Sequence, residues 1–451
     1  MTTEHGDGLP TELGGDRPTR IRWIVFALAC STSWMLYLHR YMFGLIKPEL
    51  VDEFGLGETE LGMLDSGFAL FYSGCQIPMG LALDSLGVHL ILTGMIIVWC
   101  VGLGLHAWAP RGEHLWYGRV VLGAGQAGVY AALSRVTRSW FPSRIRTTVQ
   151  GWVGVFFGRI GGLSANLLVG TVIIGTFFVP WRVAVYGLAA TGIVFAVVFA
   201  VLFRNSPGEH PLVNDAEAAL ITDDSKTWPT TVRRDSFKEM FQRMSPRSLR
   251  NLLTLNIQTI LSTVADNIFS AWIPLFLWKV HGLQFKEMSF YSALPLLGGA
   301  CGGALGGWLN DAMMRRTGSL RWSRTSVGLA GKGLAAVVLA VAMLWYDDPY
   351  TFCSLLFFVK FFSDWSLTTT WGAVTDIGGR MTATVFAFNN SVASFGAIAA
   401  PIMYGVIAEH ASWRLVFLTG AATYLLCALS WLAIDCRIPV IAESAEPTEA
   451  A

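Results

Sequence analysis

Long apolar runs are the feature that most constrains the fold of this 451-residue chain. About twelve of them have the length of roughly 20 residues that an α-helix needs to cross a bilayer. One long polar stretch, residues 204–250, divides them into six and six. The pattern predicts an all-α membrane protein with twelve transmembrane helices. We place these helices at residues 22–46, 59–83, 88–108, 114–139, 148–174, 181–204, 249–277, 287–309, 325–346, 350–375, 380–407 and 413–434.

The composition excludes two classes of protein. Only 14% of the residues are charged, whereas a soluble domain needs roughly 25% to cover its surface. A soluble enzyme is therefore excluded. The net charge of +1 provides no basic field for nucleic acid. The seven cysteines lie in or beside apolar runs with no pair at metal-ligand spacing, so neither a metal nor a cofactor is predicted.

The positive charges predict the orientation. Of the 32 Lys and Arg residues, 21 lie on the side of the N-terminus and six, including Lys47, on the other. Because loops rich in Lys and Arg stay in the cytoplasm, we expect both termini there, in a protein of the cell membrane, which in a Gram-negative bacterium is the inner membrane. The predicted parts are a cytoplasmic tail at 1–21, a bundle at 22–204, a cytoplasmic linker at 205–248, a second bundle at 249–434 and a cytoplasmic tail at 435–451. The remaining five cations fall inside runs: Arg40, Arg119, Arg159, Lys332 and Lys360.

Short motifs repeat between the two halves. Gly80-Leu-Ala-Leu-Asp84 after the second run recurs as Gly307-Trp-Leu-Asn-Asp311 after the eighth, and Trp181-Arg182 recurs as Trp413-Arg414. The repeats predict two pseudo-symmetric six-helix bundles. Parallel repeats of this kind place a substrate site between the bundles near the middle of the bilayer.

The same motifs carry a resemblance. Gly-x-x-x-Asp in both halves, followed in the second by Arg315 and Arg316, resembles the loop signature of the major facilitator superfamily. Tyr37-Leu-His-Arg40 and Arg119-x-x-x-Gly123-x-Gly125 are similar to segments of its anion:cation symporter family, which includes hexuronate, galactonate, tartrate and phthalate transporters. The resemblance implies the major facilitator fold and transport of a small organic anion.

Two positions depart from that family. A carboxylate usually precedes the arginine of the first span, and another follows the arginine of the fourth span by seven residues; the resemblance implies that both carry protons. Here these positions are His39 and Gln126. Anion exchange or facilitated diffusion by the same fold is therefore an alternative to proton-coupled symport.

The intramembrane arginines are the first candidates for substrate binding. Arg40 lies in the outer half of its span, where a charge costs roughly 2.5 to 3.5 kcal/mol unless it faces water or a partner. It either snorkels to the interface or offers a planar fork to a carboxylate. Gln126 lies two helical turns after Arg119 on the same face, so both can point into one cavity, or Gln126 simply bonds a neighbouring helix. The predicted substrate-binding set is Arg40, Arg119, Gln126, Tyr37, Tyr130, Asn389 and Asn390.

The coupling residues are predicted separately. His39 can change charge near neutral pH, although a neutral hydrogen-bonding histidine is the alternative. Asp266 is a carboxylate at mid-depth. Lys360 and Asp364, four residues apart, form either a local ion pair or part of the site. Asp65 is expected at the interface. The sequence leaves the direction of Arg159 open.

Four charged residues beside the repeated motifs are predicted to form an inner gate, with solvated loop charge as the alternative: Asp84, Arg146, Asp311 and Arg315. Glycines at 298, 302 and 306 are predicted to allow close helix contact.

The predicted function is secondary active transport of a small organic anion, a sugar acid or another carboxylate, by a monomer in the lipid bilayer. The proton, or sodium, is the expected co-ion. A sensor that binds without transporting is a further alternative. The sequence contains neither His-Glu-x-x-His nor Gly-x-Ser-x-Gly, so we do not expect an enzyme.

Overall fold

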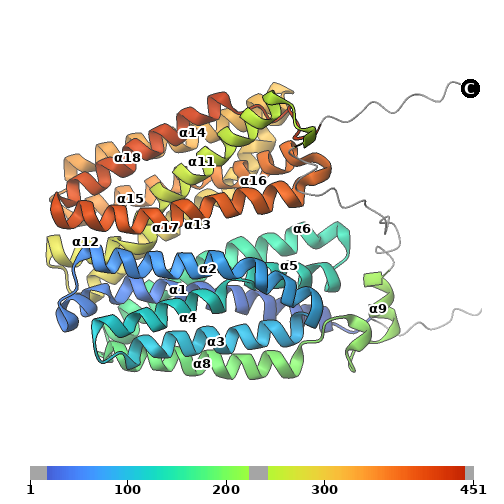
Figure 1. The fold of residues 1–451 in the computed structure, drawn as a ribbon, viewed down its shortest axis with the longest axis horizontal. Coiled ribbons are helices and arrows are strands. Elements are labelled where there is room, and N and C mark those ends of the chain that lie inside the picture. The colour runs from blue at the N-terminus through green and yellow to red at the C-terminus, as the bar shows by residue number, and fades with distance from the viewer. Residues whose placement is uncertain (1–17, 223–241, 442–451) are drawn as a thin grey trace, which may run out of the picture.

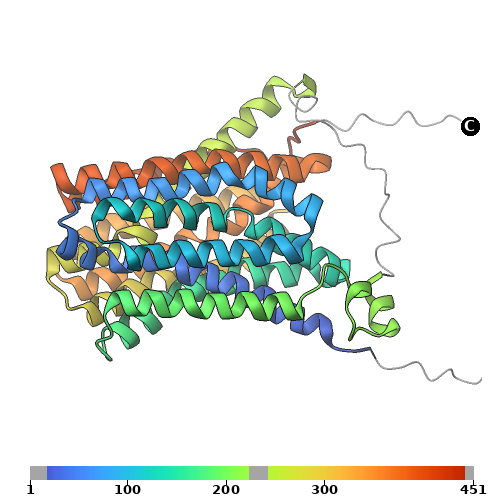
Figure 2. The same ribbon diagram turned by 60° about the horizontal axis from the view of Figure 1, so that its bottom comes forward.

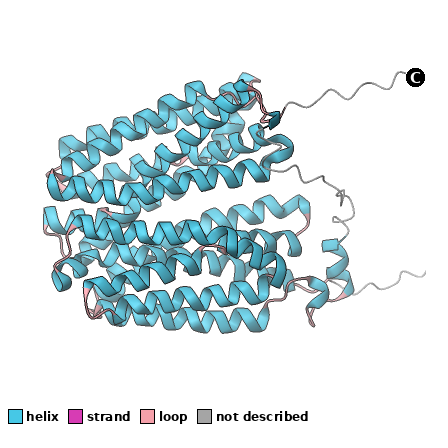
Figure 3. Cartoon of the chain, viewed as in Figure 1, coloured by secondary structure: helices cyan, strands magenta, loops and turns pink. Residues whose placement is uncertain are grey.

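The computed structural model describes residues 18–222 and 242–441. Within these ranges the regular structure is helical and contains no strand (Figure 3). The predicted tails and linker lie partly outside the described residues. We call residues 18–222 the N-terminal half and residues 242–441 the C-terminal half.

The N-terminal half forms one bundle and the C-terminal half another (Figure 1). The first is built from α1 (Ile21–Phe54), α2 (Glu58–Leu86), α3 (Val88–Trp108), α4 (Leu115–Gln126), α5 (Val129–Trp140), α6 (Ser143–Gly151), the π-helical η2 (Trp152–Phe156), α7 (Phe157–Ser164), the π-helical η3 (Ala165–Ile174) and α8 (Trp181–Leu202). The second is built from α11 (Pro246–Ala271), α12 (Ile273–His281), α13 (Phe285–Thr317), α14 (Leu320–Ala342), α15 (Pro349–Ser363), α16 (Trp365–Gly378), α17 (Thr382–His410) and α18 (Trp413–Ser430).

Several membrane segments consist of more than one helix. Eight helices in the described ranges are long and apolar enough to cross a membrane alone, and α11 with α12 forms a ninth, bent by 53°. The pairs α4–α5 and α15–α16 and the series α6 to η3 each follow one predicted span. The all-helical prediction is therefore confirmed, with breaks that periodicity did not indicate.

The first helix is longer than predicted. The apolar run ends at residue 46, but α1 continues to Phe54 and ends at Gly55, whose φ of 65° suits glycine. Lys47 therefore lies inside the helix and is fully buried. The prediction that Lys47 lies in a loop outside the first span is therefore wrong.

The two ends of the bundles differ in their contacts. We call the end with Ile21 and Pro246 the linker end, and the end with Phe54 and His281 the far end (Figures 1 and 2). Near the far end the halves are joined by polar contacts. Glu409 accepts a 2.7 Å hydrogen bond from the Thr59 backbone N–H, Lys279 pairs with Glu58, and Ser66 donates to the Ile398 carbonyl at 2.6 Å.

At the linker end, the segment after α8 folds back onto α1. Glu217 of α9 (Asp215–Thr222) is fully buried and accepts hydrogen bonds from the backbone N–H groups of Ile21 (3.2 Å) and Arg22 (3.1 Å). A carboxylate at this position satisfies free N–H groups of the first helical turn. The start of the predicted linker is thus packed against the N-terminal bundle.

The glycine stripe of α13 faces α15 and α16. A Cβ atom at Gly298 would clash with the Phe357 carbonyl oxygen, and one at Gly302 with the Phe361 carbonyl oxygen. The prediction that these glycines allow close helix contact is confirmed.

Candidate functional site

Arg40 lies on α1 among aromatic rings and is partly exposed. Its guanidinium carbon is 5.2 Å from the ring centroids of both Tyr37 and Phe68, and 4.6 Å from that of Tyr72. Nε donates a 3.0 Å hydrogen bond to Gln126, while the buried Nη2 has no hydrogen-bond partner among the described residues. No described carboxylate lies within ion-pair distance of it. The guanidinium can therefore accept an anion.

Three further residues of the predicted substrate-binding set surround Arg40. Gln126 donates through Nε2 to the Leu36 carbonyl at 3.2 Å, which leaves its Oε1 directed at Arg40. Tyr37 and Tyr130 have ring centroids 6.3 Å apart, and the Tyr130 hydroxyl donates to the Gly154 carbonyl at 3.1 Å. The fold thus brings Tyr37, Gln126 and Tyr130 together with Arg40.

Arg119 belongs to a different cluster. It forms an ion pair with Asp65, and its Nε donates to the Leu64 carbonyl at 3.1 Å. The guanidinium carbons of Arg119 and Arg40 lie 4.7 Å and 5.2 Å from the centroid of the same Phe68 ring. Unlike Arg40, Arg119 has its own carboxylate partner.

Asp65 is the centre of this second cluster. Lys47 Nζ lies 2.6 Å from its Oδ2, while Arg119 contacts Oδ1. The Asp65 side chain is only 12% exposed, so Asp65 is a buried partner of two cations rather than a solvated charge. Lys47 also donates to the Ala271 carbonyl at 2.8 Å, at the bend between α11 and α12, and thereby joins the two halves.

His39 points away from Arg40 and its aromatic neighbours. A Cβ atom at Gly192 of α8 would lie 3.0 Å from its Cε1, so the imidazole packs between α1 and α8. The side chain is fully buried, and neither ring nitrogen has a hydrogen-bond partner among the described residues.

Asp266 of α11 is the centre of a cluster in the C-terminal half. Its Oδ1 accepts hydrogen bonds from Lys360 (2.8 Å), Tyr424 (2.6 Å) and Ser363 (3.1 Å), and Lys332 Nζ lies 3.4 Å from Oδ2. The Asp266 side chain is 30% exposed, whereas those of Lys332 and Lys360 are almost completely buried. Asp266 is thus both paired and accessible.

Asp364, between α15 and α16, extends this cluster to the other half. The predicted local pair with Lys360 is confirmed, at 2.7 Å. Arg159 of α7 lies 2.5 Å from the second oxygen of Asp364. We call the resulting group of Arg159, Asp266, Lys332, Lys360 and Asp364 the charge cluster. It contains three cations and two carboxylates.

The two predicted asparagines lie elsewhere on α17. Asn389 is buried and donates to Asn256 at 3.0 Å and to Thr259 at 2.9 Å, both on α11. Asn390 is exposed. Asn389 thus contacts α11 rather than the residues around Arg40.

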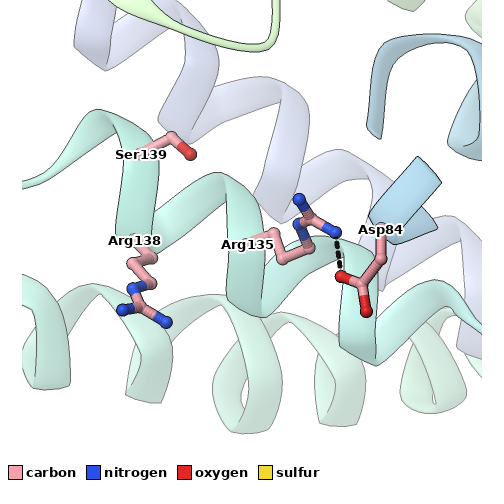
Figure 4. A pocket seen from close by; sticks show the side chains of 4 residues that line it. All are labelled: Asp84, Arg135, Arg138 and Ser139. Carbon is pink, nitrogen blue, oxygen red and sulfur yellow. Dashed lines mark hydrogen bonds and ion pairs between the residues drawn. The ribbon is translucent and has the colours of Figure 1, made fainter. Parts of the chain in front are cut away.

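The predicted gate residues lie at the linker end. Asp84 forms an ion pair with Arg135 inside the N-terminal half, beside a hollow that Arg138 and Ser139 also line (Figure 4). Asp311 and Arg315 are exposed on α13. Arg146 lies in α6, and its side chain is outside the described part of the structure.

The family can now be identified. The model of the Major Facilitator Superfamily matches residues 29–318. The chain belongs to this superfamily. The predicted resemblance to its organic anion transporters is also confirmed. A probable sulfoacetate transporter of Cupriavidus necator is 26% identical, covering 92% of this chain and 94% of the relative. A hexuronate transporter of Escherichia coli K12 is 24% identical over 74% of this chain and 76% of its own length.

A third relative and a solved structure support the same assignment. A probable galactarate/D-glucarate transporter of Bacillus subtilis is 26% identical, covering 87% of this chain and 86% of its own length. The fold is similar to a bacterial homologue of the human lysosomal transporter Spinster in an inward-facing, occupied conformation, with a TM-score of 0.72, 16% identity, and coverage of 92% and 97% of the two chains. The predicted fold, two pseudo-symmetric six-helix bundles, is confirmed for this superfamily member.

Sequence reasoning missed part of the charge cluster. Lys332 was recognised as an intramembrane cation but was given no role, although it lies 2.8 Å from Ser363 and 3.4 Å from Asp266. Tyr424 carries no signal that separates it from the other aromatic residues of its run. The position of Lys332 inside an apolar run was the available signal, because such charges are costly unless paired.

Proposed function

We propose that this protein is a secondary active transporter that carries a small organic anion, a sugar acid or another carboxylate, across the cytoplasmic membrane by alternating access. Arg40 carries the proposal, because its guanidinium lies inside the bundle and has no carboxylate partner among the described residues. An intramembrane cation without a counter-charge is costly, so an anionic substrate would restore the balance. The relatives that carry sulfoacetate, hexuronate and galactarate support the substrate class.

The surroundings of Arg40 suit an organic anion rather than an inorganic one. Tyr37, Tyr72 and Phe68 provide apolar faces for a carbon skeleton, and the tyrosine hydroxyls and Gln126 provide hydrogen-bonding groups for substrate hydroxyls. Arginine adds two parallel donors that match a carboxylate. Recognition of both the charge and the skeleton supports a sugar acid or a similar compound.

Alternating access is supported by the unequal ends of the molecule. Close to the far end, the pairs Lys279–Glu58, Glu409–Thr59 and Lys47–Ala271 join the halves. At the linker end, the Asp84 ion pair lies within one half. Because the sequence predicts 21 of the 32 cationic residues on the side of the N-terminus, we propose that the linker end faces the cytoplasm.

We propose that protons are coupled through the charge cluster. Asp266 is partly exposed, and its protonation would remove the partner of Lys332 and one of the two carboxylates bound to Lys360. His39 is less suited, because it is completely buried and has no described hydrogen-bond partner that could relay a proton. The second candidate is exchange or uniport, which the replacement of the usual acidic pair by His39 and Gln126 favours.

Uptake by proteoliposomes tests the proposal. Radiolabelled galactarate and sulfoacetate serve as probes, with and without an imposed pH gradient. We expect uptake by the wild type and its loss in Arg40→Gln. Arg414→Gln is the matched control, because that arginine is exposed and pairs with exposed Asp347. Normal uptake by Arg40→Gln would contradict the proposal.

The pH gradient separates the two mechanisms. Accumulation above equilibrium that a protonophore abolishes supports symport. Equilibration of the anion across the membrane that does not depend on the pH gradient supports uniport. Uptake that requires anion inside the liposomes supports exchange.

A further inference from the structure

We infer that the transported anion has two anionic groups, one bound by Arg40 and the other by Arg159, where it replaces Asp364. This inference rests on the proposed function and names its substrate class more closely. It concerns an arginine on α7 whose direction the sequence left open.

The two arginines differ from the other intramembrane cations in their access. Arg40 is partly exposed, and 22% of the Arg159 side chain is exposed. Arg119, Lys332 and Lys360 are almost completely buried in ion pairs. Of these five cations, only Arg40 and Arg159 can therefore be reached by a ligand in the described structure.

Two tyrosines of α1 connect the surroundings of the two arginines. Tyr37 contacts Arg40. Gly158 is the residue before Arg159, and a Cβ atom there would lie 2.9 Å from Cε2 of Tyr37 and 3.4 Å from the Tyr130 hydroxyl. One turn later on α7, Gly162 faces Tyr41 in the same way, at 3.3 Å. The small residues of α7 thus bring the Arg159 backbone beside Tyr37, the ring of which contacts Arg40.

The charges of the cluster make Asp364 replaceable. Its other oxygen lies 2.7 Å from Lys360, so its separation from Arg159 would not leave an unpaired carboxylate. The charge cluster has three cations and two carboxylates, and Arg159 is its one exposed cation. A ligand carboxylate or sulfonate could therefore take the Asp364 position on Arg159 and neutralise the excess charge.

The combined requirement is a dianion. Among the cationic groups that a ligand can reach, Arg40 lacks one negative charge and the charge cluster lacks another. Lys47 and Arg119 also share a single carboxylate, but both are buried beyond the reach of a ligand. A monoanion would supply only one of the two charges that Arg40 and the charge cluster lack. Binding of the second group would also break the Arg159–Asp364 pair, so substrate would remove a contact that joins the two halves.

Ligand affinity of the purified full-length protein tests the inference. Dissociation constants are measured for two matched pairs of probes, galactarate against galactonate and sulfoacetate against acetate. We expect the wild type to prefer the dianion of each pair. Arg159→Gln should weaken dianion binding by about 10-fold or more, since a charged hydrogen-bonding partner is lost. Its affinity for the monoanion should stay within about 3-fold.

Asp364→Asn provides an independent measurement that does not depend on the folding of Arg159→Gln. Removal of the competing carboxylate should strengthen dianion binding and leave monoanion binding unchanged. The double variant Arg159→Gln/Asp364→Asn keeps the net charge and should show no preference between the members of a pair. Weaker or unchanged dianion binding by Asp364→Asn would overturn the inference.

The outcomes separate the two proposals. Equal wild-type affinity for both members of each pair, with loss of binding in Arg40→Gln, overturns the dianion inference alone. An equal loss of monoanion and dianion binding in Arg159→Gln also overturns the dianion inference alone. If Arg40→Gln binds all anions like the wild type, or the wild type binds none, the proposed function fails, and this inference fails with it.

Discussion

Arg159 Nη2 lies 2.5 Å from Asp364 Oδ2, and this ion pair joins α7 of the N-terminal half to the C-terminal half. Asp364 occupies the junction of α15 and α16, where the predicted single span is broken. The pair is separate from the contacts of the far end, where Lys47 and Glu409 join the same two halves. The halves are therefore held at one end and also across the charge cluster.

Lys47→Met should weaken the closure of the far end. The variant removes the 2.8 Å contact with the Ala271 carbonyl, which crosses from one half to the other. We expect a larger population in which the far ends are separated. Distances between spin labels at positions 111 and 347, both exposed, measure this population in a cysteine-free background. An unchanged distance distribution would show that Lys47 does not hold this end closed.

Asp65→Asn should destabilise the protein strongly. Lys47 and Arg119 would remain buried without their shared carboxylate, and breaking a buried pair costs about 3 to 5 kcal/mol. Asp84→Asn is the control, because its ion pair with Arg135 is exposed and such pairs contribute about 0 to 1 kcal/mol. Thermal unfolding in detergent compares the two variants. Similar melting temperatures would contradict the role given to Asp65.

Asp266→Asn should uncouple anion transport from the proton gradient. The variant keeps the shape of the side chain but cannot take up a proton or neutralise Lys332 and Lys360. We expect exchange of labelled for unlabelled anion to continue while accumulation driven by a pH gradient disappears. His39→Gln should retain both activities. The reverse result, with coupling lost only in the His39 variant, would assign the proton to the histidine.

Asp435, beyond the last span, should make stability depend on pH. Hydrogen bonds from Arg437, at 2.9 and 2.8 Å, hold the pKa of the Asp435 carboxyl below its ordinary value. A carboxyl with a lowered folded-state pKa stabilises the fold above its unfolded pKa of about 3.9, and this contribution is lost as the pH falls. The wild type should therefore melt higher than Asp435→Asn at neutral pH, by the equivalent of about 1 kcal/mol or less. The difference should shrink on acidification, and a constant difference would exclude this linkage.

The sequence predicted the features that depend on the order of residues along one helix. Twelve apolar runs and their repeats indicated the bundles, and the spacing of Lys360 and Asp364 predicted their ion pair, found at 2.7 Å. Neighbouring helical residues lie about 100° apart around the axis, which is why His39 and Arg40 point to different sides. Such features follow from helical geometry alone.

Contacts between helices could not be predicted in the same way. Asp65 was expected at the interface because only its depth in one span was known; the approach of α1 and α4 gives it two cationic partners. Likewise, the end of an apolar run at residue 46 did not show that α1 continues, since the bend between α11 and α12 provides the carbonyl partner of Lys47. The direction of Arg159 required the position of Asp364 in the other half.

A structure of the protein saturated with galactarate would show whether Arg40 binds the anion inside the bundle. We expect ligand density in contact with the Arg40 guanidinium, against the rings of Tyr37 and Tyr72. A ligand bound elsewhere, with Arg40 retaining its present surroundings, would contradict it.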